Sequence, residues 1–375
     1  MRKVHTIAGT MSGTSLDGVD VAILTTDGEA HLVPGVTHFQ AYTDKERKVL
    51  NAAFDAGPDI VDRKDRSGIL GEAEEIVTRV HIEALTDGTN LSSQPVEYVG
   101  FHGQTIFHDP ARKLTVQIGD AQSVSDALGI PVVYDMRQND VSQGGEGAPL
   151  APAFHGAMVA ALGAKEPAIF LNIGGVANVT YVGDGGELLA FDTGPGNALL
   201  DDLMQAEFGE RMDTGGKIAN SGRIEARALN ELLLHPFFDR EPPKSLDRRD
   251  FHNFALDKLA GLSTPDKLAT LTRFTVQAIM RAHEWLPKAP NTMIVSGGGA
   301  KNPVMMQHLK EASQITPQIA SNLGWDDVFI EANAFAYLAA RHLRDLPLSF
   351  PGTTSVPEPM RGGEIAYPRG SRAFT

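Results

Sequence analysis

Apolar and polar stretches alternate near the start of the chain in a way that predicts short strands joined by turns. An apolar run at residues 4–8 leads into a turn rich in Gly, Ser and Thr at residues 9–20, and a second apolar run covers residues 19–24. An Asp27-Gly28 turn then precedes a third run at residues 30–33. Strand-length runs separated by short turns of this composition predict an antiparallel meander of three strands.

The same pattern occurs a second time, from residue 168. Residues 168–173, 176–182 and 187–191 read as strands, and glycine-rich turns at 174–175 and 183–186 separate them. Identity between the two stretches is slight, so the order of elements alone carries the comparison. That order predicts a second meander of the same kind.

The elements after each meander also correspond. Helical spacing of apolar residues covers residues 67–85 in the first half and 267–285 in the second. Each is followed by a short apolar strand, at residues 96–101 and 292–295. The repetition predicts two α/β domains of similar topology that flank a central cleft.

The predicted boundary between the domains lies near residues 140–149, where several glycines break any regular pattern. We therefore expect an N-terminal domain at residues 1–140 and a C-terminal domain at 141–375. A chain of 375 residues is also too long for one simple core.

Composition narrows the classes of function. The formal net charge of −14 argues against nucleic acid and against anionic membranes as partners. The sequence contains no cysteine, which excludes disulfides, thiolate zinc sites and cysteine nucleophiles. It shows neither a secretory signal nor an apolar run long enough to span a bilayer, so we expect a cytoplasmic protein.

The turn at residues 9–20 combines two kinds of ligand group. Its Gly, Ser and Thr residues offer backbone N–H groups and hydroxyls, which suit phosphate oxygens. It also holds Asp17 and Asp20, and carboxylates suit hydrated magnesium rather than phosphate. The combination suggests a nucleotide carried with magnesium. An ordinary Gly/Asp hairpin explains the turn equally well.

Asp192 occupies the corresponding position in the second half. It ends a predicted strand and begins the turn Asp192-Thr193-Gly194-Pro195-Gly196. If the halves are equivalent, this turn faces the first one across the cleft, where a carboxylate could accept a proton from a hydroxyl or water, or hold a metal. The alternative is a local turn hydrogen bond. The duplicated frame favours the functional interpretation.

Other candidates are weaker individually. The glycine-rich turn at residues 296–299 could receive a purine or phosphate, although such turns usually serve only the backbone. Arg137 is a natural ligand for a carboxylate, and a surface ion pair with Asp135 or Asp140 is equally plausible. Glu331 could be a plain first-turn acid of a helix, and His102 a hydrogen-bonding residue rather than a catalyst.

Together these motifs resemble those of the anhydro-N-acetylmuramic acid kinase family. The similarity extends over almost the whole chain and lies in segments at residues 9–20, 101–105, 116–120, 144–150, 171–179, 191–197, 296–302 and 331–335. Two positions depart from the expected pattern: Met136 stands in place of Phe and Glu146 in place of Gln. Neither change removes a proposed catalytic group.

The resemblance implies a fold and a reaction. The fold would be the duplicated actin-like, RNase H-like ATPase fold. The enzyme would open the 1,6-anhydro bridge of 1,6-anhydro-N-acetylmuramic acid with water and phosphorylate O6 with ATP, in peptidoglycan recycling. Asp192 would be the general base for that water, and Arg137 and Glu331 would lie around the sugar. A homodimer is possible.

The resemblance also implies a nucleotide site that holds ATP and Mg²⁺. Asp17 would be the metal ligand. The residues expected to bind the cofactor are Gly13, Thr14, Ser15, Leu16, Asp17, Gly18, Val19, Asp20, Gly194, Gly297, Gly298 and Gly299. Two alternatives stay open at this point: a kinase of an ordinary, non-anhydro sugar, and a non-catalytic actin-like ATP-binding protein.

Overall fold

The computed structural model describes residues 3–370 and divides into two compact units. Unit 1 is Met1–Leu162 together with Val328–Thr375, and unit 2 is Gly163–Asp327. The sequence placed the boundary at residue 140 and assigned the rest of the chain to the second domain. The structure differs, because residues 141–162 and the C-terminal segment belong with the first unit.

Unit 1 is built on a six-stranded sheet. Its strands, from one edge to the other, are β13 (Glu364–Ala366), β7 (Val132–Tyr134), β4 (Tyr98–Gly100), β1 (His5–Met11), β2 (Gly18–Thr26) and β3 (Leu32–Ala41). The meander β1–β2–β3 is antiparallel, whereas β4 and β7 run parallel to β1. A separate hairpin pairs β5 (Gln104–Asp109) with β6 (Leu114–Ile118).

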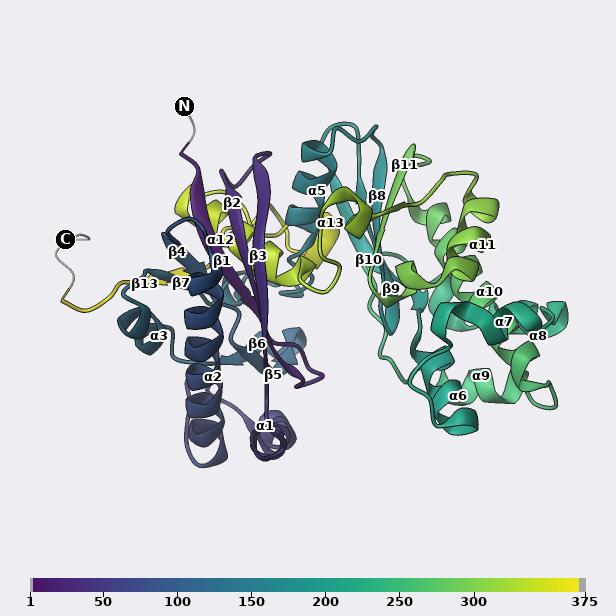
Figure 1. Ribbon diagram of the computed structural model, residues 1–375, viewed down its shortest axis with the longest axis horizontal. Coiled ribbons are helices and arrows are strands. Elements are labelled where there is room, and N and C mark those ends of the chain that lie inside the picture. Colours follow the sequence, from purple (N-terminus) through teal and green to yellow (C-terminus); the bar gives the residue numbers. More distant parts are fainter. Residues whose placement is uncertain (1–2, 371–375) are drawn as a thin grey trace. The chain divides into compact units, whose positions relative to one another are not determined.

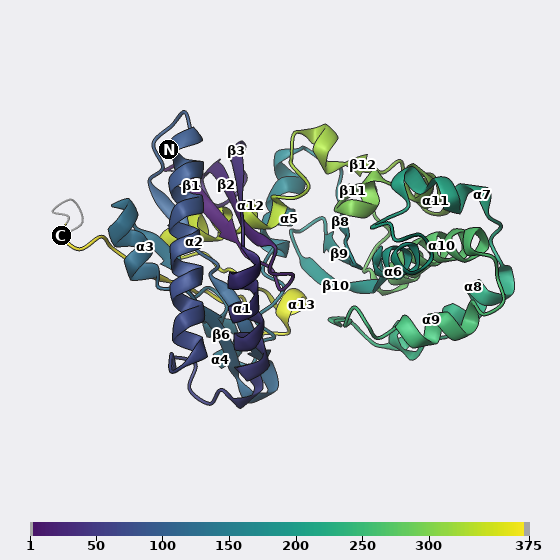
Figure 2. The ribbon, with the colours of Figure 1, turned by 60° about the horizontal axis from the view of Figure 1, so that its bottom comes forward.

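Helices from both ends of the chain cover this sheet. The helices of unit 1 are α1 (Asp44–Ala56), α2 (Ile69–Leu91), α3 (Ala121–Leu128), α4 (Gln138–Ser142), α5 (Pro152–Ala161), α12 (Ile330–Leu343) and α13 (Pro351–Thr354). Helix α2 packs along β2 and β3, as Figures 1 and 2 show. Helix α12, in the yellow part of the chain, packs on β1, β2 and β4.

Two glycines allow α12 to approach the sheet closely. A Cβ on Gly9 of β1 would lie 1.9 Å from the carbonyl oxygen of Ala332, and one on Gly100 of β4 would lie 2.2 Å from that of Phe335. Any larger residue would push the helix away from the strands. These contacts fix the N-terminal turn of α12, which carries Glu331.

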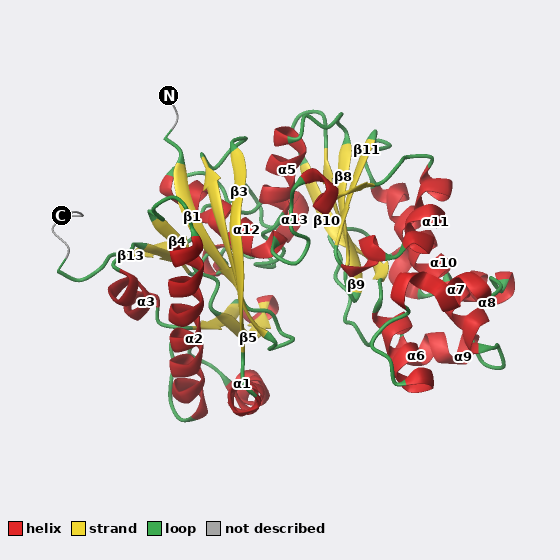
Figure 3. Cartoon of the chain, viewed as in Figure 1, coloured by secondary structure: helices red, strands yellow, loops and turns green. Residues whose placement is uncertain are grey.

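Unit 2 repeats the arrangement. Its sheet has the order β10 (Leu188–Pro195), β9 (Val176–Val182), β8 (Ala168–Ile173), β11 (Thr292–Ser296) and β12 (Gln318–Ile319). The meander β8–β9–β10 is antiparallel, and β11 and β12 run parallel to β8. Its helices gather beside the sheet (Figure 3), and they are α6 (Ala198–Phe208), α7 (Lys217–Ser221), α8 (Ala226–Leu232), α9 (His252–Lys258), α10 (Thr264–Ala282) and α11 (Pro303–Ser313).

The predicted duplication is therefore confirmed. In each unit a three-stranded antiparallel meander is followed by two strands parallel to its first strand, which is the duplicated actin-like, RNase H-like topology. Strands β8 and β9 coincide with the expected ranges. Strand β3 is longer than expected, and β10 continues beyond Asp192 to Pro195, so Asp192 lies inside a strand rather than at its end.

Among the described helices, none combines the length and the apolar character that crossing a membrane would need.

Candidate functional site

In unit 1 the turn between β1 and β2 is held by buried side chains. The Ser12 hydroxyl donates to Gln104 Oε1 at 2.5 Å and lies 3.1 Å from the Gly18 carbonyl oxygen. Gln104 Nε2 donates to the carbonyl oxygen of Gly13 at 3.1 Å. Leu16 adopts a positive φ of 54°, and its side chain is buried. The turn is thus a fixed backbone frame rather than a loose hairpin.

The predicted nucleotide residues of this turn differ in exposure and fall into three groups. Thr14, Ser15 and Asp17 are exposed, and the Ser15 hydroxyl donates to Asp17 Oδ1 at 2.8 Å. Leu16 and Val19 are core residues and can offer only backbone groups. The remaining members are partly exposed or lie within β2: Gly13, Gly18 and Asp20.

Arg137 is partly buried and held at two points. Its Nη1 donates to the Gly147 carbonyl oxygen at 3.0 Å, and its Nη2 lies 3.1 Å from His102 Nε2. The guanidinium also lies over the Phe335 ring, 5.6 Å from its centroid. Burial lowers the pKa of Arg137 to about 10, so the side chain remains cationic at neutral pH.

The expected alternative for Arg137, a surface ion pair, is wrong. Asp135 pairs instead with Arg63. Asp140 is buried and accepts from the Gly147 N–H at 2.6 Å and from the Thr354 hydroxyl at 2.6 Å. Asp140 therefore fixes the position of Gly147 in the glycine-rich loop, and the carbonyl oxygen of Gly147 in turn accepts a hydrogen bond from Arg137.

His102 is a hydrogen-bonding residue, as the sequence suggested. Its Nδ1 lies 2.8 Å from the carbonyl oxygen of Gly103, which requires an N–H there and leaves the Nε2 lone pair to accept from Arg137. Burial, followed by the nearby Arg137 charge, holds the pKa of His102 well below its ordinary value. A neutral His102 thus orients the arginine.

Glu331 lies in the first turn of α12. Solvent reaches its side chain, yet the protein packed around it removes enough water to raise its pKa, and the charge of Arg137 opposes that rise. Glu331 in turn favours the cationic form of Arg137. Two of the three predicted catalytic residues therefore influence each other's charge within unit 1.

Asp192, the third, lies in unit 2 at an irregularity of β10, where the pairing with β9 shifts between Asp192 and Gly194. Its Oδ2 accepts one backbone hydrogen bond, from Leu246 N–H at 2.8 Å. Burial raises the pKa of Asp192 to about 6, although that hydrogen bond lowers it. A carboxylate with this pKa is ionised at neutral pH and basic enough to accept a proton during a reaction.

The predicted glycines at residues 297–299 gather at one end of the unit 2 sheet. Gly297 has a positive φ of 82°, and a Cβ there would lie 2.5 Å from Asn172 Oδ1. A Cβ on Gly298 would lie 3.4 Å from Asn197 Nδ2. Gly194 is different: it is buried, and a Cβ there would lie 2.9 Å from that of Ala278.

Sequence reasoning missed several groups that shape these sites. Asn172 and Asn197 flank the Gly174-Gly175 turn, where Asn197 Nδ2 donates to the carbonyl oxygen of Ile173 at 3.0 Å and its own N–H donates to that of Gly174 at 2.8 Å. Asn172, two residues before the Gly174-Gly175 turn, was the available signal. No local pattern marked Leu246, because its bond to Asp192 spans 54 residues.

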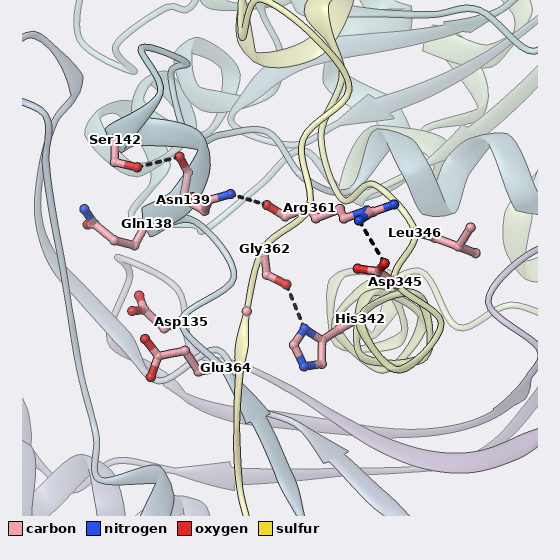
Figure 4. A pocket seen from close by; sticks show the side chains of 11 residues that line it. Asp135, Gln138, Asn139, Ser142, His342, Asp345, Leu346, Arg361, Gly362 and Glu364 are labelled. Carbon is pink, nitrogen blue, oxygen red and sulfur yellow. Dashed lines mark hydrogen bonds and ion pairs between the residues drawn. The ribbon is translucent and has the colours of Figure 1, made fainter.

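A separate pocket of about 380 Å³ lies in unit 1 and is not the predicted site. Figure 4 shows it around His342, Arg361 and Asp345, near the C-terminal end of α12 and thus at the opposite end of that helix from Glu331. The His342 ring donates to the Gly362 carbonyl oxygen at 2.9 Å, and Arg361 pairs with Asp345 at 2.8 Å. These polar groups satisfy one another.

Comparison with known proteins identifies the family to which this chain is similar. A profile of the anhydro-N-acetylmuramic acid kinase family matches residues 5–368. A protein of that name from Nitrobacter winogradskyi is 48% identical over 97% of this chain and 100% of its own length. One from Methylobacterium nodulans is also 48% identical, over 96% of this chain and 99% of its own.

Solved structures are more distant. An activator of the 2-hydroxyisocaproyl-CoA dehydratase from Clostridium difficile, with bound ADPNP, aligns at a TM-score of 0.46 and 12% identity, covering 91% of this chain and 96% of that one. The assignment therefore depends on the profile, which covers nearly the whole chain, and on the curated relatives. The chain belongs to the anhydro-N-acetylmuramic acid kinase family.

Proposed function

We propose that this protein uses ATP and water to convert 1,6-anhydro-N-acetylmuramic acid into N-acetylmuramic acid 6-phosphate and ADP. Kinase activity on the anhydro sugar follows from membership of the family. The observation that carries the proposed mechanism is Asp192, a partly buried carboxylate whose pKa is raised to about 6.

Asp192 acts as the general base in this proposal. Its carboxylate takes a proton from the water that attacks C1 of the sugar, and the bond between C1 and O6 breaks. O6 then attacks the γ-phosphorus of ATP, ADP leaves, and Asp192 returns its proton to solvent. A base with a pKa somewhat below the working pH combines a high ionised fraction with useful basicity.

Arg137 and Glu331 bind and orient the sugar in this proposal. The two contacts to His102 and Gly147 fix the plane of the Arg137 guanidinium and leave further N–H groups available for an oxygen ligand. Glu331 accepts hydrogen bonds from hydroxyl groups or from the attacking water. The charge of each group favours the ionised form of the other, against the effect of burial on both.

ATP phosphates would contact the frame around Gly13, Thr14 and Ser15, and the adenosine would lie at Gly297, Gly298 and Gly299. The exposed carboxylate of Asp17, beside the Ser15 hydroxyl, has the oxygen chemistry that Mg²⁺ requires. The described residues hold no group of three or more His, Cys, Asp or Glu side chains arranged to bind a metal. A single carboxylate fits a magnesium ion held mainly by nucleotide phosphates, where it would neutralise phosphate charge.

Three further expectations accompany the proposal. The net charge of −14 disfavours nucleic acid as a partner. We also place the enzyme in the cytoplasm, where ATP is available. A homodimer is one assembly that sedimentation of the purified protein would test.

One assay tests the reaction. Purified protein with ATP, magnesium and 1,6-anhydro-N-acetylmuramic acid in ¹⁸O-water should release ADP and a ring-opened 6-phosphate with the label at C1. Glucose and N-acetylmuramic acid serve as control acceptors. Phosphorylation of these free sugars without turnover of the anhydro sugar would overturn the proposal, and ATP-dependent light scattering without any turnover would favour a filament protein.

A further inference from the structure

A short segment between η4 (Pro236–Asp239) and α9 lies against the base. The Asp192 N–H donates to the Lys244 carbonyl oxygen at 2.9 Å, and the Leu246 N–H donates to Asp192 Oδ2 at 2.8 Å. Residues 244–246 therefore bind both the backbone and the carboxylate of Asp192. Because the segment lies outside the strands and helices, side-chain anchors add to these two hydrogen bonds in holding it in place.

The Lys244 ammonium is such an anchor. Its Nζ donates to the carbonyl oxygens of Phe237 and Phe238, at 3.2 and 3.3 Å. It also lies over the Phe237 ring, 4.7 Å from the centroid, and over the Trp285 ring, at 5.4 Å. A third ring, that of Phe191 on β10, lies 6.0 Å away. Cation–π contacts of this kind strengthen when the cation is partly withdrawn from water.

We propose that Lys244 is a positioning residue for the general base: its ammonium ties residues 244–246 to the aromatic side chains around β10 and thereby holds the Leu246 N–H on the Asp192 carboxylate. The proposal rests on the function proposed for Asp192. It adds a cation that touches neither substrate nor nucleotide in the mechanism above, yet sets the proton affinity of the base.

The charges around both groups agree with this role. Lys244 faces Arg281, Arg240 and Asp239, and burial together with the two arginines lowers its pKa to about 8, so the ammonium is the main species at pH 7. Asp239 itself pairs with Arg281 at 3.0 Å. For Asp192, burial raises the pKa and the Leu246 hydrogen bond lowers it. Loss of that hydrogen bond must therefore raise the pKa further.

The test compares two lysines. In Lys244→Met the apolar stem remains but the charge and donors are lost, so the acid limb of the kcat/KM profile should move up by about 0.5 to 1 pH unit. Activity at pH 6 should fall about 2- to 5-fold, with KM for ATP unchanged. Lys244→Arg keeps the cation, so the acid limb of its kcat/KM profile should lie at the same pH as in the unmodified protein. Lys244→Gln provides a second uncharged variant if Lys244→Met folds poorly.

Lys258→Met is the matched control. Lys258 also lies over an aromatic ring in unit 2, 5.5 Å from the centroid of Phe254, and pairs with Glu231. Within the described part of the chain it forms no hydrogen bond or ion pair with residues 244–246, so its substitution should leave the acid limb in place. Comparing Lys258→Met with Lys244→Met distinguishes the general effect of removing a cation from an aromatic ring from the specific effect of removing the anchor of residues 244–246.

A second readout does not depend on turnover. The ¹³Cγ resonance of Asp192, identified by its absence in Asp192→Asn, should titrate at higher pH in Lys244→Met than in the unmodified protein. An unchanged titration would overturn the proposal. If the titration moves while Asp192→Asn remains fully active, the positioning role stands and the assignment of Asp192 as the base fails.

Discussion

At the residue scale, the proton affinity of Asp192 follows from two opposing effects. Withdrawal from water disfavours the carboxylate, and one hydrogen bond from Leu246 favours it, which leaves the pKa at about 6. The same balance has a consequence for stability. Because the folded pKa lies above the ordinary value of 3.8, the folded state binds this proton more tightly than the unfolded chain does.

This linkage predicts that Asp192→Asn lowers the activity of the protein and raises its stability. The ionised carboxylate costs stability in full above about pH 6, and the cost disappears below about pH 3, where the carboxyl group is protonated in both the folded and the unfolded state. The variant should lose about 100- to 10,000-fold in kcat. Its free energy of unfolding at pH 7.5 should be about 1 kcal/mol higher than that of the unmodified protein, with no difference at about pH 3. Urea unfolding at the two pH values checks the sign, and a lower stability at pH 7.5 would contradict it.

Arg137 gives a second prediction at this scale. Its two acceptors, His102 Nε2 and the Gly147 carbonyl oxygen, are bound by different nitrogens of one planar fork. A lysine ammonium cannot reproduce that geometry. Arg137→Lys should therefore lower kcat/KM for the anhydro sugar by about 10- to 100-fold, while KM for ATP stays within about 2-fold. Steady-state kinetics with each substrate varied in turn distinguishes this result from a general loss of active protein.

At the element scale, the approach of α12 to the sheet determines where Glu331 lies. Gly100→Ala should destabilise unit 1 by about 1–3 kcal/mol, since its Cβ would lie 2.2 Å from the Phe335 carbonyl oxygen. Gly13→Ala is the control, because a Cβ there meets only Ser15 Oγ, at 3.7 Å. Thermal unfolding should show a clear loss for Gly100→Ala and little change for Gly13→Ala. Equal effects of the two substitutions would contradict the argument.

The elements also show what local sequence can predict. The meanders were predictable because each consists of apolar runs joined by short glycine turns, so neighbours in sequence are neighbours in the sheet. The strand β13 was not, because its three residues pair with β7, more than 200 residues away. Asp192 was found from its place beside Thr-Gly, whereas Lys244 and Leu246 become visible only when the chain folds back on it.

At the scale of the whole molecule, unit 1 is discontinuous in sequence. Helix α2 and every strand of its sheet except β13 come from the first part of the chain, whereas α12, α13 and β13 come from the last. Nothing in the local pattern of residues 328–343 distinguishes a helix of the second domain from one that returns to the first. The predicted boundary at residue 140 failed to capture this return, which only contacts with β1, β2 and β4 reveal.

Because unit 1 is discontinuous in sequence and unit 2 is not, we expect fragments of the two units to differ in their ability to fold alone. Residues 163–327 contain a continuous core between Ile169 and Leu309, so this fragment should fold alone and unfold cooperatively. Residues 1–162 should not, because without α12 one face of the sheet loses the helix that packs against Gly9 and Gly100. Adding a separate peptide of residues 328–370 should restore dispersed amide resonances to the 1–162 fragment. A 1–162 fragment that folds cooperatively without the peptide would show that α12 is dispensable for unit 1.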